Sequence, residues 1–174
     1  MSIFRPPLRP PGAVEENLFS HLCIRCGKCI AACPYHTIRL TGGFSKNRLL
    51  PHIIPREHPC HLCMRCTPVC PSGALDPSLS DLAHARIGKA HMLKHKCHNF
   101  IEGDIMCTTC FDRCPLKRRS IILGHGGIIP VITEACVGCG VCECTCPQNA
   151  IIVLPENYPA PEGAIPHAKA GTWS

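Results

Sequence analysis

The sequence is poor in aromatic residues and has no long apolar runs. Its 174 residues include only five Phe, two Tyr and one Trp. No stretch approaches the roughly 18 consecutive apolar residues of a membrane-spanning helix, so we expect no direct membrane span. The opening MSIFRPPLRPPGA has neither an apolar signal core nor a twin-arginine pair, so no export signal is expected in the chain as written.

Motifs of common enzyme sites are also missing. The sequence contains no Gly-rich nucleotide loop, no Cys-x-x-Cys-His haem attachment and no paired-carboxylate signature. Apart from the cysteines, no group of residues suggests a substrate site. We therefore predict no catalytic residues and a protein without enzymatic activity of its own.

Cysteine, by contrast, is abundant, with 17 residues. A chain of this length can build a hydrophobic core without covalent staples, so the sulfur serves another purpose. A disulfide framework and metal-binding thiolates are the two alternatives. The odd count and the repeated Cys-x-x-Cys spacing favour metal. The 18 prolines and 14 glycines indicate short elements joined by many turns.

The cysteines form four runs that recur along the chain. The runs begin at Cys23, Cys60, Cys97 and Cys136, separated by 37, 37 and 39 residues, which marks an internal repeat. Three runs match the bacterial ferredoxin pattern Cys-x2-Cys-x2-Cys-x3-Cys-Pro. Their cysteines are Cys23, Cys26, Cys29 and Cys33 in the first run, Cys60, Cys63, Cys66 and Cys70 in the second, and Cys136, Cys139, Cys142 and Cys146 in the fourth.

The third run departs from this pattern. Nine residues instead of two separate Cys97 from Cys107, after which Cys110 and Cys114-Pro115 restore the spacing. The simplest interpretation is a seven-residue insertion that leaves all four ligands in place. A zinc ion or a lost cluster at this run is the alternative.

The spacing suits [4Fe–4S] clusters. Three thiolates on a tight loop can hold three iron corners, and the fourth cysteine of a run ligates the other cluster of a pair. We expect that fourth cysteine to start a short helix, and we expect Gly27, Gly138 and Gly140 where backbone approaches the cluster closely. Zinc sites usually have two Cys-x-x-Cys halves and a long spacer, without the Cys-x3-Cys-Pro ending. Cys144 is left over and is predicted to be a small buried hydrophobe; a swap for Cys142 or Cys146 is the alternative.

The formal charge of +6 counts every cysteine as neutral. An oxidised cluster with four thiolate ligands carries about −2, so four clusters would bring the net charge to about −2. The basic composition therefore gives no reason to expect a nucleic-acid partner. Histidines beside the runs, such as His21, His36, His58, His61 and His98, are expected at the surface or next to ligands, with protonation-linked tuning of the potential as the alternative.

Between the runs, segments rich in β-branched residues flank glycine turns. Residues 37–40 and 49–54 surround Gly42-Gly43, and residues 121–123 and 128–133 surround residues 124–127, so each pair predicts a hairpin. Residues 150–154 predict a further strand.

The linking segment 78–96 is different, because Leu79, Leu82, Ala83 and Arg86 have helical spacing. With residues 76–78 as its start, this spacing predicts a helix.

We therefore predict an α+β fold of two ferredoxin-like 2[4Fe–4S] modules with short hairpins, short helices and Pro-rich terminal arms. The spacing alone allows tandem pairing of consecutive runs or a nested pairing. The Pro-rich ends, residues 1–16 and 155–174, are expected to be arms lying on a partner or disordered tails. Trp173 near the end hints at docking.

These residues resemble the NapG and MauM type of ferredoxin-like protein, which is associated with periplasmic nitrate reductase and methylamine utilisation. The resemblance rests on residues 9–13 (Arg-Pro-Pro-Gly-Ala), residues 23–27 (Cys-Ile-Arg-Cys-Gly), residues 70–76 and the interrupted third run, and it spans residues 9–154. The chain is also similar to the four-cluster subunits of molybdopterin oxidoreductases, in which the pairing is nested.

The resemblance implies four [4Fe–4S] clusters bound by sixteen cysteines in nested sets. These sets are Cys23, Cys26, Cys29 with Cys146; Cys136, Cys139, Cys142 with Cys33; Cys60, Cys63, Cys66 with Cys114; and Cys97, Cys107, Cys110 with Cys70. The domain at residues 17–154 would then have an outer module, 17–56 with 117–154, and an inner module, 57–116.

The resemblance also implies an electron-transfer subunit of a respiratory redox complex. Its partners would be other redox subunits, such as a membrane quinol-oxidising protein and a terminal reductase or dehydrogenase. Family members normally carry a twin-arginine signal and often a longer second run. The expected location is therefore membrane-associated through partners, periplasmic by resemblance and cytoplasmic if the missing signal is genuine.

Two further classes of function are alternatives. One is a redox-sensing or cluster-delivery protein, and the other is an enzyme with one substrate-accessible cluster. Both would favour an incomplete ligand set, for which only the third run is a candidate.

Overall fold

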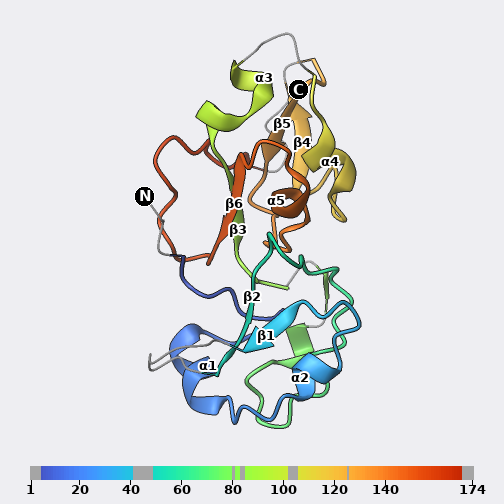
Figure 1. Cartoon of the computed structure of the whole chain (residues 1–174), viewed down its shortest axis with the longest axis vertical. Helices are drawn as coiled ribbons and strands as arrows, with labels where there is room; N and C mark the ends of the chain where they lie inside the picture. Colours follow the sequence, from blue (N-terminus) through green and yellow to red (C-terminus); the bar gives the residue numbers. More distant parts are fainter. Residues whose placement is uncertain are drawn as a thin grey trace.

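The computed structural model describes residues 5–40, 49–79, 81–82, 85–101, 106–124 and 126–169. Residues Gly42-Gly43, Ala83 and Trp173, on which some predictions rest, lie outside these ranges. Its elements are short, as the proline and glycine content predicts (Figure 1). The helices are α1 (Glu16–Leu22), α2 (Lys28–Ala31), α3 (His98–Ile101), α4 (Thr109–Arg113) and α5 (Val141–Thr145), with 3-10 turns η1 (Pro77–Leu79) and η3 (Lys94–Lys96). The strands are β1 (Ile38–Leu40), β2 (Pro51–Ile53), β3 (Lys89–Met92), β4 (Ile121–Gly124), β5 (Ile129–Ile132) and β6 (Ile151–Leu154).

Both predicted hairpins are confirmed. Strands β1 and β2 pair antiparallel with Ile38 opposite Ile53, and β4 pairs antiparallel with β5 with Ile121 opposite Ile132. The β-branched side chains in these segments suit a pleated, half-buried surface. Each hairpin joins the end of one cysteine run to the start of the next, so consecutive runs are brought back side by side.

The predicted strand at residues 150–154 is also confirmed, as β6. Its antiparallel partner is β3, with Lys89 opposite Leu154 and Met92 opposite Ile151. The predicted helix from residue 78 is wrong within the described residues, which form the 3-10 turns η1 and η3 with β3 between them. Asp76 Oδ1 accepts hydrogen bonds from the Ser78 amide and hydroxyl at 2.8 and 2.7 Å, which caps a single turn. Pairing with β6 then overrides the helical spacing.

The first and second halves of the chain occupy opposite ends of the elongated molecule, as Figure 1 shows. The β1–β2 hairpin lies in the lower half of the view, and the β3–β6 and β4–β5 pairs lie in the upper half. The nested modules, 17–56 with 117–154 and 57–116, are therefore not those that the chain forms. The mixture of short helices and two-stranded sheets agrees with the predicted α+β class.

The Pro-rich ends pack on the chain itself where they are described. Leu8 is buried and its carbonyl accepts a hydrogen bond from the Ile53 amide at 2.8 Å, while the Gly12 amide donates to the Ala85 carbonyl at 3.1 Å. Near the other end, Ala168 is buried beside β5, its amide bonded to the Ile132 carbonyl at 2.9 Å. Parts of both ends are therefore held by contacts within the chain, and docking of the Pro-rich ends on a partner stays a prediction.

The core contains few large side chains. Phe19 is the only aromatic residue among the largest fully buried side chains of the described residues, and most of the others are aliphatic. Nine cysteines belong to the same buried cluster: Cys29, Cys33, Cys60, Cys66, Cys110, Cys114, Cys136, Cys139 and Cys142. The interior is thus built around sulfur to an extent that ordinary packing does not require.

Candidate metal centres

The sixteen predicted ligand cysteines gather into four groups of four. Site 1 is Cys23, Cys26, Cys29 and Cys70; site 2 is Cys60, Cys63, Cys66 and Cys33; site 3 is Cys97, Cys107, Cys110 and Cys146; and site 4 is Cys136, Cys139, Cys142 and Cys114. Each group takes three cysteines from one run and the last cysteine of the adjacent run.

Three of the groups each line one cavity. All four cysteines of site 1, all four of site 2 and all four of site 4 line the same cavity in each case. At site 3, the Cys110 thiol lies close enough to interact electrostatically with the thiols of Cys97, Cys107 and Cys146. The inserted third run therefore still brings four sulfurs together.

This grouping is tandem, so the nested pairing expected from the resemblance is wrong. Cys70 lies with the first run and not with the third, and Cys146 lies with the third run and not with the first. The physical reason is the pair of hairpins. Because β1–β2 returns the second run beside the first and β4–β5 returns the fourth beside the third, consecutive runs exchange their last cysteines.

Short helices precede the fourth cysteine of a run instead of starting at it. Helix α4 ends before Cys114 and α5 ends before Cys146, and both cysteines have extended backbone, with ψ of 122° and 115°. The proline that follows each of them disfavours the helical conformation of the preceding residue. The cysteine therefore leaves the helix axis and turns toward the adjacent site, which corrects the predicted helix start.

The ligand loops share a left-handed backbone at equivalent positions. The third residue of each intact run has positive φ, at Arg25 (58°), Leu62 (55°) and Gly138 (70°). In the fourth run glycine is required for space as well, since a Cβ on Gly138 would lie 2.5 Å from the backbone of Gly88. Gly27 has a positive φ of 74°, which favours glycine, and a close approach to a cluster there stays a prediction.

Backbone amides donate hydrogen bonds to the cysteine sulfurs. The Leu62 amide lies 3.4 Å from Cys60 Sγ, the Leu75 amide 3.4 Å from Cys70 Sγ and the Ala150 amide 3.3 Å from Cys146 Sγ. Such bonds stabilise a thiolate and tune the potential of a cluster that it holds.

Burial controls the protonation of the thiols. It raises the pKa of Cys66, Cys110 and Cys139 to about 12, with neighbouring thiols adding to the effect. Burial also acts to raise the pKa of Cys70, but hydrogen bonds from the Leu75 amide and from Ser72 lower it overall. Because metal binds the thiolate, loading these sites releases protons.

Cys144 is exposed, so the prediction of a small buried hydrophobe is wrong. Cys142 lines site 4 and Cys146 belongs to site 3, so neither is replaced by Cys144.

Across the described ranges, no three His, Cys, Asp or Glu side chains converge closely enough to hold a single metal ion. In the same part of the chain, the structure has no helix with the length and apolar character needed to cross a membrane.

Two important side chains were not predicted. Glu143 lies between ligands on α5 and is 1% exposed, and its carboxylate accepts two hydrogen bonds from the Arg5 guanidinium at 2.7 and 2.8 Å and one from the Val153 amide at 2.8 Å. Asn99, in the inserted part of the third run, is also buried. A carboxylate between two ligands was the only signal for Glu143, and nothing in the local sequence marked Asn99.

Four groups of four cysteines on short hairpins and loops define a ferredoxin-type iron–sulfur protein. The model of the 4Fe-4S dicluster domain matches residues 22–74, and that of the 4Fe-4S binding domain matches residues 129–152. The dicluster match spans the first and second runs together, in agreement with their tandem grouping.

Curated relatives extend the match along most of the chain. The ferredoxin-type protein NapG of Escherichia coli (strain K12) is 40% identical over 166 residues, covering 85% of this chain and 70% of the relative. The methylamine utilization ferredoxin-type protein MauM of Methylorubrum extorquens is 39% identical over 161 residues, covering 85% and 72%. The ferredoxin-type protein NapF of Escherichia coli (strain K12) is 28% identical over 148 residues.

The chain therefore belongs to the NapG and MauM family of ferredoxin-type proteins. It is an iron–sulfur electron-transfer protein whose cofactors are [4Fe–4S] clusters. The resemblance identified from the sequence is confirmed.

Proposed function

We propose that this chain relays electrons through four [4Fe–4S] clusters held by the sixteen cysteines of sites 1 to 4. The proposal rests on one observation: all sixteen predicted ligands fall into four complete groups of four. A tetrahedral zinc site would hold its sulfurs about 3.8 Å apart, since Zn–S bonds are about 2.3 Å long. Among the described residues, no three of these side chains converge closely enough to hold one metal ion, so the four sulfurs of each group suit a larger inorganic group.

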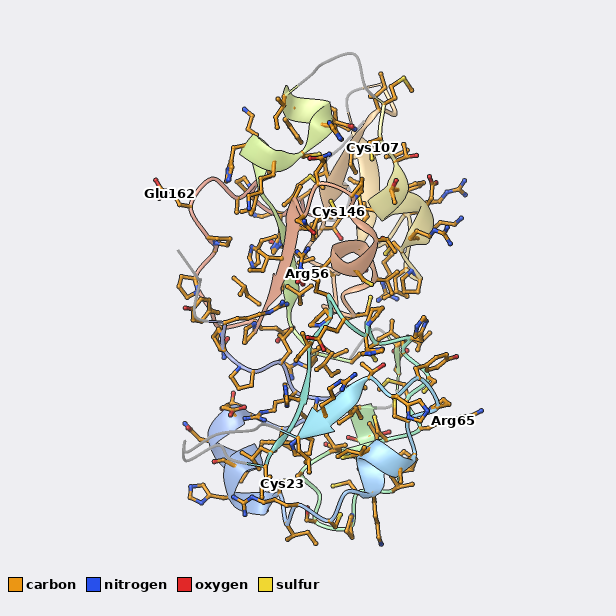
Figure 2. All side chains as sticks on the ribbon, viewed as in Figure 1. Cys23, Arg56, Arg65, Cys107, Cys146 and Glu162 are labelled. Atoms are coloured by element: carbon orange, nitrogen blue, oxygen red, sulfur yellow. The ribbon has the colours of Figure 1, made fainter. Side chains whose placement is uncertain are left out.

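The sites follow one another in the order 1, 2, 4, 3. Cys66 of site 2 interacts electrostatically with Cys29 of site 1, and Cys142 of site 4 interacts with Cys110 of site 3. Between the halves, the Cys60 amide donates a hydrogen bond to the Cys139 carbonyl at 2.8 Å, which links sites 2 and 4 directly. Figure 2 agrees, with Cys23 near one end of the long axis and Cys107 near the other.

When bound, the clusters supply one-electron redox chemistry. The chain's own residues hold the groups in sequence, exclude water from them and set the field around them. Thiolates provide the ligands, and all four cysteines of site 4 are buried. Backbone amides such as those of Leu62 and Ala150 stabilise negative charge on sulfur.

The two end sites are the proposed points of electron entry and exit. Beside site 1, Cys26 is exposed and Ile24 is 63% exposed. Beside site 3, Met106 is 67% exposed and Ile101 is also exposed. Exposed apolar side chains near a redox centre suit a transient protein contact.

We extend the proposal to the chain's surroundings from its family. It would act as a subunit of a larger membrane-associated respiratory complex, between a quinol-oxidising membrane protein and a terminal reductase or dehydrogenase, on the periplasmic side. The complete ligand set of site 3 supports this relay over a sensor, a cluster-delivery protein or an enzyme with an open cluster.

Anaerobic metal analysis tests the proposal. Protein that has never met oxygen should contain about sixteen iron and sixteen sulfide per chain, without zinc, and dithionite reduction should give interacting S = 1/2 EPR signals. A content of about twelve iron per chain would mean that the relay has three clusters instead of four. Zinc in place of iron would overturn the proposal.

A further inference from the structure

Site 3 is closed differently from the other three sites. In the compact runs, a two-residue spacer fixes the distance between the first two ligands, whereas nine residues separate Cys97 from Cys107. A loop of that length leaves the two ends free to separate unless other contacts hold them, because closing it has an entropic cost.

The Asn99 side chain supplies such contacts. It is 9% exposed, and its Oδ1 accepts a hydrogen bond from the Cys107 amide at 2.9 Å. Its Nδ2 donates to the Cys107 carbonyl at 3.0 Å and to the Ile128 carbonyl at 3.1 Å. Asn99 thus binds the backbone amide and carbonyl of Cys107, a proposed ligand, and connects them to Ile128, the residue before β5.

The backbone around Asn99 reaches the other ligand. The Asn99 amide hydrogen-bonds to the Cys97 thiol. The α3 turn that carries Asn99 is closed onto the same cysteine, since the amides of Phe100 and Ile101 donate to the Cys97 carbonyl at 2.9 and 3.2 Å. One residue therefore connects the two ends of the insertion.

We propose that Asn99 is a positioning residue that replaces the missing two-residue spacer and holds Cys97 and Cys107 in the geometry for binding a cluster at site 3. The inference rests on the proposed function, because it assumes a cluster at that site. Only a primary amide fits all three side-chain bonds. A carboxylate lacks the N–H donors for the two carbonyl oxygens, and an aliphatic side chain of similar shape can neither donate nor accept a hydrogen bond.

Two variants of the full chain test the role. Asn99→Leu keeps the branched shape but removes the three side-chain hydrogen bonds, and Asn99→Asp keeps only the acceptor. Each should contain about twelve iron per chain instead of sixteen, with loss of one cluster's EPR signal and retention of the other three.

The matched control is Thr133→Val. Thr133 is also buried, and its hydroxyl donates a hydrogen bond to the Arg119 carbonyl and accepts one from the Ala135 amide, neither of which belongs to a proposed ligand. The control should retain about sixteen iron.

The outcomes separate the two proposals. Sixteen iron and four unaltered EPR signals in either Asn99 variant would overturn the positioning role. So would a loss of iron spread over all four sites, since that would indicate a general folding role. Wild-type protein with fewer than four clusters would instead refute the proposed function, whatever the variants show.

Discussion

Site 4 in the second half has all four of its cysteines buried, whereas sites 1 and 2 in the first half each expose one, Cys26 and Cys63. Site 3, also in the second half, has Cys110 buried and its other three cysteines half-buried, so the contrast is sharpest between site 4 and site 1. Burial disfavours added negative charge, and exposure gives access to water. The difference suggests lower potentials at site 4 and greater lability at site 1.

The same contrast appears in the ligand loops. Where the first half places Arg25 and Leu62 in left-handed backbone, the second half has Gly138 against the Gly88 backbone. Arg25 is exposed and Leu62 is buried, so the first-half loops have room for a side chain at this position, while the close approach of the Gly88 backbone leaves none at Gly138.

The largest expected effect comes from removing a buried ligand. Cys142→Ser should eliminate the cluster at site 4 and leave about twelve iron per chain, because burial disfavours the charged serine oxygen that would have to replace the thiolate. Cys26→Ser, at the exposed ligand of site 1, should retain an oxygen-ligated cluster with an altered EPR spectrum. Cys144→Ser is the control and should match wild type. Equal losses in the first two variants would contradict the comparison.

The buried ion pair should give the next largest effect. Glu143→Gln removes the charge that pairs with Arg5, and breaking a buried pair should lower the free energy of unfolding by about 3 kcal/mol. In the first half, Glu16 pairs with Arg9 but is 47% exposed, so Glu16→Gln should lower it by about 1 kcal/mol at most. Anaerobic denaturant titration of the loaded proteins measures both values. A larger loss of stability for Glu16→Gln than for Glu143→Gln would contradict the assignment of the stronger ion pair to the second half.

A methyl group on the tight loop tests the packing difference. Gly138→Ala adds a Cβ 2.5 Å from the Gly88 backbone at a φ of 70°, so it should destabilise the protein by about 2 to 3 kcal/mol. Arg25→Ala changes the equivalent position of the first run, which already carries a Cβ in left-handed backbone, and should change stability by about 0.5 kcal/mol or less. Thermal melts under argon would distinguish them, and comparable losses would argue against the close contact.

Acid sensitivity should be the smallest effect. Burial, with the neighbouring His167, lowers the pKa of His91, and burial likewise lowers the pKa of His52 in the first half. Since the folded-state pKa lies below the unfolded value of about 6.5, stability should decline as pH falls through and below 6.5. His91→Phe should flatten that decline, leaving the part due to His52. An unchanged slope between pH 7 and 5 would show that His91 does not titrate on unfolding.

The sequence predicted the cysteine runs and both hairpins correctly, because ligand spacing and β-branched segments around glycine are local signals. Strand β3 was missed, since its residues, Lys-Ala-His-Met, have little strand preference and pair only because β6 lies beside them. The partners of Asn99 and Glu143 are backbone groups and an arginine distant in sequence, which no local pattern reveals.

The pairing of the runs shows how a local signal can be outweighed. The hairpins at residues 38–53 and 121–132 indicate that consecutive runs return beside each other, whereas similarity to nested four-cluster subunits indicates the opposite pairing. The groups are tandem because each short antiparallel hairpin places two consecutive cysteine runs next to each other.

Iron analysis of the double variant Cys23→Ala/Cys70→Ala tests the tandem grouping most directly. If both cysteines serve site 1, removing them together deletes one cluster, and the anaerobically purified protein should contain about twelve iron per chain. If they serve different clusters, as in a nested arrangement, two clusters are lost and about eight iron should remain. Twelve is the result that this structure predicts, and eight would contradict it.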